Sequence, residues 1–285
     1  MYSQLWVEEQ YKEFLGLRYK VDKVLFSGKS EFQTVDVVET VGHGRMLLND
    51  GYVMVTERDE FIYHDMIAHV PLFVHPNPLK VLIIGGGDGG TAREVLRHSK
   101  VESVTMVEID KMVTDACIEF IPKTAACLSD PRVTLKFEDG VSFVKKTAEK
   151  YDVILVDSTD PIGPATPLFN EDFYRDVHAI LADDGIVVSQ GESTFYEAEM
   201  QTKLMQIKNG LFDISMLYQF TNSTYPGGLW AFTYASKGLH PIRDFKADRV
   251  VESGLDFEYY NAKMHSSAFS LPTFVEKRLA HLIKE

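Results

Sequence analysis

The chain has 285 residues, of which 45% are hydrophobic and 25% charged, and its 29 Lys and Arg against 42 Asp and Glu leave a net charge of −13. This hydrophobic content supplies a core for one large or two smaller domains, which excludes a disordered chain. The acidic balance argues against a nucleic-acid-binding protein, because a phosphate backbone is bound by clustered Lys and Arg. No apolar run approaches the roughly 20 residues of a membrane-spanning helix.

The cellular setting is predicted from the termini and the cysteines. Residues 1–10 are polar, so we expect no secretory signal peptide. Cys117 and Cys127 have no His or Cys neighbours at metal-ligand spacing, and we expect free thiols in a reducing, cytoplasmic environment.

The first 59 residues are predicted to form a small β domain. Short β-type stretches alternate with turns, and Asn49-Asp50-Gly51 is a hairpin signal. The predicted strands cover residues 19–25, 32–39, 45–48 and 52–56. A helix is expected over residues 60–68, and two prolines, Pro76 and Pro78, then break the chain.

From Lys80 onward the pattern changes to alternating strands and helices, which predicts a doubly wound α/β sheet in a second domain, residues 60–285. Val81–Ile84 is apolar throughout, as is typical of a parallel strand buried on both faces. Further strands are predicted at 103–107, 133–137, 152–156 and 185–189, with helices at 91–97, 111–120, 141–149 and 171–181. Strands near 214–220 and 229–235 are expected to complete the sheet as an antiparallel pair, and residues 272–283 to form a terminal helix.

Ligands of such sheets lie beyond the carboxyl ends of the strands. The first predicted strand is followed by Gly85–Gly90, whose GxGxxG spacing permits a tight turn and a close approach of a ligand. Asp88 within this loop would repel a pyrophosphate, which favours a ligand without phosphate. Glu108, at the end of the second strand, can accept both hydroxyls of a ribose, which supports an adenosyl nucleoside and leaves NAD open.

Acidic residues also follow the third and fourth strands. The Asp139 carboxylate could accept a hydrogen bond from the exocyclic amine of adenine, and Gly140 would let the ring lie close to the backbone. We expect Asp88, Asp157 and Asp160 to converge on one crevice, where unpaired carboxylates are costly unless a cation neutralises them. The sequence therefore predicts a positively charged ligand. Each acid alone could instead cap a helix, and a metal could supply the charge, although the wide sequence spacing of the carboxylates disfavours one.

Several longer motifs carry a resemblance to a known family. They are Thr56–His64, Ile84–Val95, Asp157–Pro164, Ser189–Glu192, Thr224–Pro226, Tyr259–Asn261 and Ala268–Pro272. Together they closely resemble the spermidine synthases, the polyamine aminopropyltransferases, and the resemblance runs from about Trp6 to the C-terminus.

The resemblance implies a small N-terminal β domain joined to a Rossmann-like domain of the class I methyltransferase type, in a homodimer or homotetramer. It implies transfer of the aminopropyl group of decarboxylated S-adenosylmethionine, a co-substrate, to putrescine, which gives spermidine and 5′-methylthioadenosine. No metal or redox cofactor is expected for this reaction.

The same resemblance implies the roles of individual residues. It assigns the methylthioadenosine part to Gln33, Glu108, Asp139, Gly140 and Pro164, and the aminopropyl ammonium to Asp88. It assigns the acceptor amine to Tyr63, His64, Asp157, Asp160, Gln190 and Tyr225, with Asp157 as proton acceptor. The alternative for His64 and Tyr225 is a packing role.

The identity of the acceptor stays open at the sequence level. Met54 and Ser223 depart from residues common in the family, so cadaverine, a longer polyamine or agmatine are alternatives to putrescine. Two other functions are also open. One is an S-adenosylmethionine-dependent amine N-methyltransferase, which Asp88 disfavours because that substrate carries a carboxylate. The other is a non-catalytic polyamine or nucleoside sensor.

Overall fold

The computed structural model describes residues 4–161 and 163–285, and its N-terminal part is a five-stranded antiparallel sheet. The strands lie in sequence order: β1 (Leu5–Lys12), β2 (Leu15–Lys29), β3 (Thr34–Thr40), β4 (Gly44–Asn49) and β5 (Tyr52–Thr56). The predicted hairpin joins β4 to β5, with positive φ at Asp50 and Gly51. The strand predicted over residues 32–39 begins only at Thr34, because the backbone N–H groups of residues 32 and 33 donate to the Ser30 hydroxyl in a turn.

The second sheet has seven strands in the order β11-β12-β10-β9-β6-β7-β8. They are β6 (Lys80–Gly85), β7 (Ser103–Glu108), β8 (Val133–Phe137), β9 (Tyr151–Asp157), β10 (Leu181–Ser193), β11 (Ile214–Thr221) and β12 (Leu229–Ser236). Five neighbouring strands, β10 to β8, run parallel, and β12 is antiparallel to both β10 and β11. The predicted doubly wound sheet with a final antiparallel pair is confirmed.

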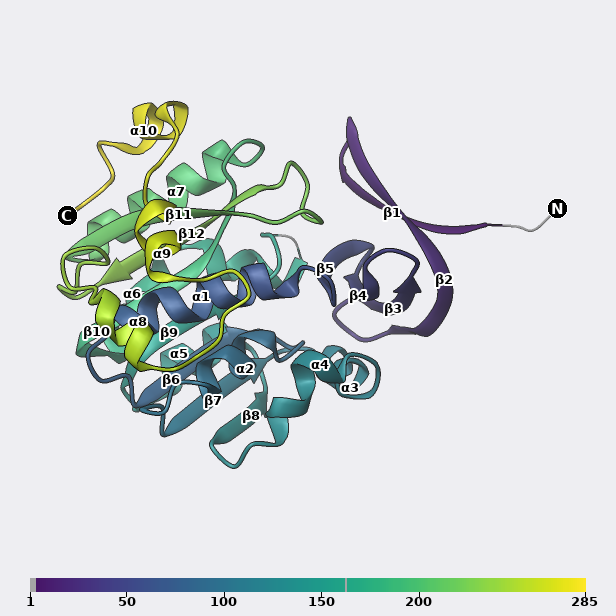
Figure 1. Ribbon diagram of the computed structural model, residues 1–285, viewed down its shortest axis with the longest axis horizontal. Helices are drawn as coiled ribbons and strands as arrows, with labels where there is room; N and C mark the ends of the chain where they lie inside the picture. Colours follow the sequence, from purple (N-terminus) through teal and green to yellow (C-terminus); the bar gives the residue numbers. More distant parts are fainter. Residues whose placement is uncertain (1–3, 162) are drawn as a thin grey trace.

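Helices cover both faces of this sheet (Figure 1). Val81 and Ile83 of β6 pack in one core with α1 (Glu60–Val74), α2 (Gly90–Leu96), α8 (Ala247–Glu252) and α9 (Ala262–Ala268). Leu82 and Ile84 pack in a second core with α5 (Gly140–Lys146), α6 (Glu171–Ile180) and α7 (Ala198–Leu211). The apolar run in β6 is therefore buried on both faces, as predicted. None of the described helices is long and apolar enough to cross a membrane.

Three predicted helices differ from the observed ones by more than one residue at an end. The helix that starts at Glu60 continues through Pro71 to Val74, the helix predicted over 141–149 ends at Lys146, and the terminal helix, α10, covers only Thr273–Leu279. Strand β1 and helices α7, α8 and α9 were not predicted. Strand β1 lacks the usual alternation of apolar and polar residues, because Glu8, Glu9 and Gln10 are three consecutive polar residues.

The position of the ligand crevice follows from the strand order. The chain forms β6 first, continues outward through β7 and β8, and then returns to place β9 on the other side of β6. Loops after β6 and β9 therefore diverge, and Gly85 lies directly opposite Asp157 in the register.

The N-terminal sheet packs over this end of the larger sheet (Figure 1). Val35 and Val37 of β3 share a core with Val113 and Ala116 of α3 (Lys111–Phe120). Beyond α3 lie the short helix α4 (Pro122–Ala125) and a 3₁₀ turn, Ala126–Ser129.

Candidate active site

A cavity lies beyond the carboxyl ends of the parallel strands, between the two sheets. Ten of the twelve residues predicted for the site line it: Gln33, Tyr63, His64, Asp88, Glu108, Asp157, Asp160, Pro164, Gln190 and Tyr225. The three acids that the sequence predicted to converge, Asp88, Asp157 and Asp160, therefore share one cavity.

Asp139 and Gly140 lie outside this cavity. Asp139 lines a separate hollow with Ile109, and its carboxylate accepts hydrogen bonds from the backbone N–H groups of Val141 and Ser142, which caps α5. At Gly140 a Cβ would come within 2.6 Å of Ile84 Cγ2, so close packing on β6 already requires glycine there. The helix-cap alternative thus describes the observed contacts of Asp139.

The glycine loop after β6 is shaped by contact with β9. Gly85 has a φ of +84°, and a Cβ there would lie 2.1 Å from the carbonyl oxygen of Asp157. The Gly86 N–H donates to that same oxygen at 2.9 Å. Asp88 Oδ1 accepts from the Gly90 N–H at 2.9 Å, which closes the turn into α2. These contacts hold Asp88 and Asp157 on the cavity wall.

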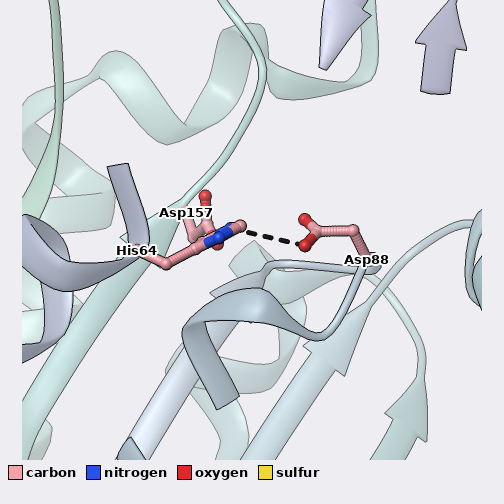
Figure 2. A group of neighbouring side chains, drawn as sticks. All are labelled: His64, Asp88 and Asp157. Carbon is pink, nitrogen blue, oxygen red and sulfur yellow. Dashed lines mark ion pairs between the residues drawn. The ribbon is translucent and has the colours of Figure 1, made fainter. Parts of the chain in front are cut away.

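His64 approaches Asp88 from helix α1, as Figure 2 shows. Its Nε2 lies 3.3 Å from Asp88 Oδ1, and its Nδ1 lies 2.6 Å from Glu60 Oε2, a buried carboxylate that also accepts from Arg93. Burial alone would lower the pKa of His64, but Asp88 and Glu60 together raise it to about 10. The side chain is therefore an imidazolium at neutral pH.

This ion pair is a source of positive charge that the sequence analysis did not consider, because it weighed only a ligand or a metal as partner of the carboxylates. The loops after the strands hold no Lys or Arg, yet a histidine from α1 lies between Glu60 and Asp88. The approach is close because residue 90 is glycine: a Cβ there would lie 2.1 Å from His64 Cε1.

Asp157 ends β9 and lines the cavity, with its side chain beside His64 (Figure 2). Burial and the nearby Asp88 carboxylate raise the pKa of its carboxyl, whereas His64 and a hydrogen bond from Thr91 act in the opposite direction. The Thr91 hydroxyl donates to Asp157 Oδ2 at 2.6 Å. Such a carboxyl accepts a proton more readily than an ordinary aspartate does.

Two tyrosines line the cavity beside Asp157. Burial, with Asp157 next in importance, raises the pKa of both the Tyr63 and the Tyr225 phenol well above the usual value, so both remain protonated. Tyr225 donates its hydroxyl to the Met54 carbonyl oxygen at 3.0 Å, which links the β11–β12 loop to the N-terminal sheet. Tyr225 thus has a packing contact as well as a place on the cavity wall.

Asp160 and Gln190 line the cavity near a glutamate that the sequence analysis missed. Gln190 Nε2 donates to Asp160 Oδ1 at 3.0 Å, and burial raises the pKa of Asp160 to about 6. The missed residue, Glu9 of β1, also lines the cavity, accepts from the Val53 N–H at 3.3 Å through Oε1, and has no partner for Oε2 among the described residues. Burial raises the pKa of Glu9 to about 8. The sequence analysis missed Glu9 because it did not predict strand β1.

The two residues that depart from the family pattern differ in position. Met54 lines the cavity. Ser223 does not, and its hydroxyl donates to Asp59 Oδ2 at 3.0 Å. Any effect on the acceptor is therefore to be expected from Met54.

The remaining predicted residues surround the glycine loop. Glu108 Oε1 accepts from the Asp110 N–H at 2.8 Å, and burial raises the pKa of Glu108 to about 7. A Cβ at Gly87 would lie 2.9 Å from Glu108 Oε2, so the loop approaches this carboxylate closely. Gln33 reaches the same region from the β2–β3 turn by donating to Asp110 at 3.1 Å.

Two clusters among the described residues have a spacing that a metal ion could bridge. One is His64, Asp88 and Asp157. In this cluster both ring nitrogens of His64 already contact carboxylates, Nδ1 that of Glu60 and Nε2 that of Asp88. The other is Asp65, His69 and Glu94, which is buried; Glu94 is already paired with Arg93 and Arg97, and Asp65 accepts from two backbone N–H groups.

A doubly wound sheet with an acidic, glycine-lined cavity at its switch point defines the class of Rossmann-like proteins, whose ligands bind at that position. Residues 60–246 match the spermine/spermidine synthase domain, and residues 5–57 match the spermidine synthase tetramerisation domain. The chain therefore belongs to the spermine/spermidine synthase family.

Individual relatives agree over nearly the whole chain. A polyamine aminopropyltransferase of Alkaliphilus metalliredigens is 47% identical over 97% of this chain and 98% of its own length. A crystal structure of a spermidine synthase in complex with the transition-state analogue AdoDATO has a TM-score of 0.95, with 41% identity over 97% of this chain and 95% of that one. Spermidine synthase from Thermotoga maritima has a TM-score of 0.94, also at 41% identity, over 97% of this chain and 94% of that one.

Proposed function

We propose that this chain is a polyamine aminopropyltransferase that transfers the aminopropyl group of decarboxylated S-adenosylmethionine to putrescine. The observation that carries the proposal is the shared cavity of Asp88, Asp157 and Asp160, since both substrates are cations. Family membership and the name of the Alkaliphilus relative support the same reaction.

The reaction needs no group beyond the two substrates and the side chains of the site. The acceptor's ammonium gives a proton to Asp157, and the amine's lone pair then attacks the carbon next to the sulfonium. A C–N bond forms, the C–S bond breaks, and sulfur leaves with the bonding electrons as a neutral thioether. Two effects lower the barrier: the amine and the sulfonium carbon are held in line, and Asp157 accepts the proton.

The residues divide between the two substrates in this proposal. Gln33, Glu108 and Pro164 bind the methylthioadenosine part from the cavity wall, and Asp88 binds the aminopropyl ammonium. The family resemblance alone adds Asp139 and Gly140 to the adenine side, since neither lines the cavity and the Asp139 carboxylate caps α5. The acceptor lies among Tyr63, His64, Asp157, Asp160, Gln190 and Tyr225. Glu9 extends this set, because its buried, unpartnered oxygen and its position on the cavity wall suit the acceptor's second ammonium.

The assembly and location are further parts of the proposal. The match of residues 5–57 to a tetramerisation domain supports a homo-oligomer, a dimer or a tetramer, built through the N-terminal sheet. We place the enzyme in the cytoplasm, because its described cysteines are free thiols, as a reducing compartment keeps them.

Product analysis by mass spectrometry tests the function. The protein is incubated with decarboxylated S-adenosylmethionine and a mixture of putrescine, cadaverine, spermidine and agmatine, and a parallel reaction contains S-adenosylmethionine instead. An aminopropylated amine together with methylthioadenosine supports the proposal and identifies the acceptor. A methylated amine in the parallel reaction would favour an N-methyltransferase, and nucleoside binding without any product would favour a sensor.

A further inference from the structure

Thr91 is a fully buried residue in the first turn of α2, in a stretch that the sequence analysis used only for the family resemblance. Its hydroxyl donates to Asp157 Oδ2 at 2.6 Å and so connects the start of α2 to the end of β9. The contact joins residues 66 positions apart in the sequence. It is not a local helix cap, because its acceptor lies on another element.

The rest of the Asp157 environment shows why this hydrogen bond matters. The backbone of Asp157 is held through its carbonyl oxygen, which accepts from the Gly86 N–H. The Thr91 hydroxyl adds a fixed contact to one oxygen of the carboxylate itself. The Tyr63 phenol also faces this carboxylate, and together with the Thr91 hydroxyl it gives the carboxylate the same orientation in every turnover.

We infer that Thr91 is a positioning residue for the proposed reaction: through Oδ2 it holds the Asp157 carboxylate so that the other oxygen takes the acceptor's proton. This inference rests on the proposed function. No new bond is made to Thr91, and the proton passes from the acceptor's ammonium to Asp157 alone.

The hydrogen bond also acts on the protonation of Asp157. A donor to the ionised carboxylate favours that form, so it opposes the rise in pKa caused by burial and by Asp88. Loss of the donor therefore moves the titration of Asp157 to higher pH and leaves less of the proton-accepting form at low pH.

Other titratable groups face Asp157 from each neighbouring element. They are Asp88 from the glycine loop, His64 and Tyr63 from α1, Glu108 from β7 and Tyr225 from the β11–β12 loop. All of them remain in a Thr91 variant, so differences between variants report on the hydroxyl.

The test compares Thr91→Val, which has the same shape without the hydroxyl, with Thr91→Ser, which keeps the hydroxyl. The pH profile of kcat/KM for the acceptor is measured at saturating decarboxylated S-adenosylmethionine, and methylthioadenosine affinity is measured by calorimetry. Thr114→Val is the matched control, because Thr114 in α3 is equally buried and its hydroxyl has no hydrogen-bond partner among the described residues.

We expect Thr91→Val to move the acidic limb of the profile up by about one pH unit, so that kcat/KM below the limb falls about tenfold. Thr91→Ser restores the position of the limb, and Thr114→Val leaves it in place. All variants bind methylthioadenosine as the wild type does, which shows that the fold and the nucleoside side are intact.

Two results would overturn the inference. In the first, the limbs of Thr91→Val and wild type coincide. In the second, Thr91→Val and Thr91→Ser are impaired alike, which would assign Thr91 to packing at the start of α2. Failure of the proposed function is seen separately, as wild-type protein that binds methylthioadenosine but forms no aminopropylated product, and it would remove the basis of the inference.

Discussion

Asp157→Asn removes the proposed proton acceptor and keeps the shape of the side chain. An alkylammonium has a pKa about six units above that of an ordinary aspartic acid, so proton transfer between the two costs about 8 kcal/mol at about 1.36 kcal/mol per unit. In the structure, burial and Asp88 raise the pKa of Asp157 and reduce this cost. Asparagine cannot take the proton, and a positioned general base contributes about 10²- to 10⁴-fold. We expect kcat to fall by that factor.

The assay is a time course of methylthioadenosine and polyamine formation at saturating concentrations of both substrates. The amide side chain of the Asp157→Asn variant still offers an oxygen to the Thr91 hydroxyl, so the cavity wall keeps its geometry. We therefore expect unchanged methylthioadenosine affinity and no loss of thermal stability, since a carboxylate next to Asp88 has been neutralised. A variant that keeps more than about a tenth of the wild-type kcat would show that Asp157 is not the base.

Three further predictions address the same wall of the cavity. Asp88→Asn should weaken binding of decarboxylated S-adenosylmethionine by about 10- to 100-fold, because a hydrogen bond to a charged group is lost. Binding of methylthioadenosine should not change, because that molecule lacks the ammonium. Equal weakening of both in calorimetry would show that Asp88 does not bind the ammonium. Gly85→Ala should destabilise the fold by at least about 3 kcal/mol in urea unfolding, because a Cβ meets the Asp157 carbonyl oxygen at 2.1 Å. Gly51→Ala is its control, with the same φ of +84° and no atom within 4 Å, and should cost only about 1 to 2 kcal/mol. His64 has a pKa raised from 6.5 to about 10 in the fold, so its contribution to stability is complete below pH 6.5 and is lost as pH rises toward 10. Unfolding free energy should therefore fall with pH in this window more steeply in wild type than in His64→Gln, by at most about 1.4 kcal/mol per pH unit, and parallel curves would contradict the assignment of an imidazolium.

The strands of the larger sheet could be predicted from the sequence, because their hydrophobic pattern is a property of short segments. Val81–Ile84 is apolar at every position and is followed at once by Gly85–Gly90, and strands buried on both faces produce such runs wherever they occur. The N-terminal sheet was only partly accessible. Strand β1 is hidden because Glu9, one of its inward-facing residues, is a buried acid, and no rule of alternation expects a carboxylate in that position.

The composition of the site was likewise predictable up to a limit. Strand order brings Asp88, Asp157 and Asp160 together, since the carboxyl ends of parallel strands meet at one edge, and this rule needs no coordinates. Asp139 follows a strand in the same way, yet its carboxylate caps α5 outside the cavity. Sequence position places an acid at the end of a strand but does not decide in which direction its oxygens point.

The sequence by itself therefore determined the fold class, the glycine loop and the acidic character of the cavity, because hydrophobic periodicity and strand-end position are properties of short segments. Only the tertiary structure decided the charges and hydrogen bonds of the side chains that line the cavity. His64 becomes a cation because α1 places it between Glu60 and Asp88, and Thr91 reaches Asp157 because β6 and β9 are neighbours. The His64–Asp88 and Thr91–Asp157 contacts depend on distances of about 3 Å between residues on different elements, and electrostatic and hydrogen-bond energies change steeply over such distances.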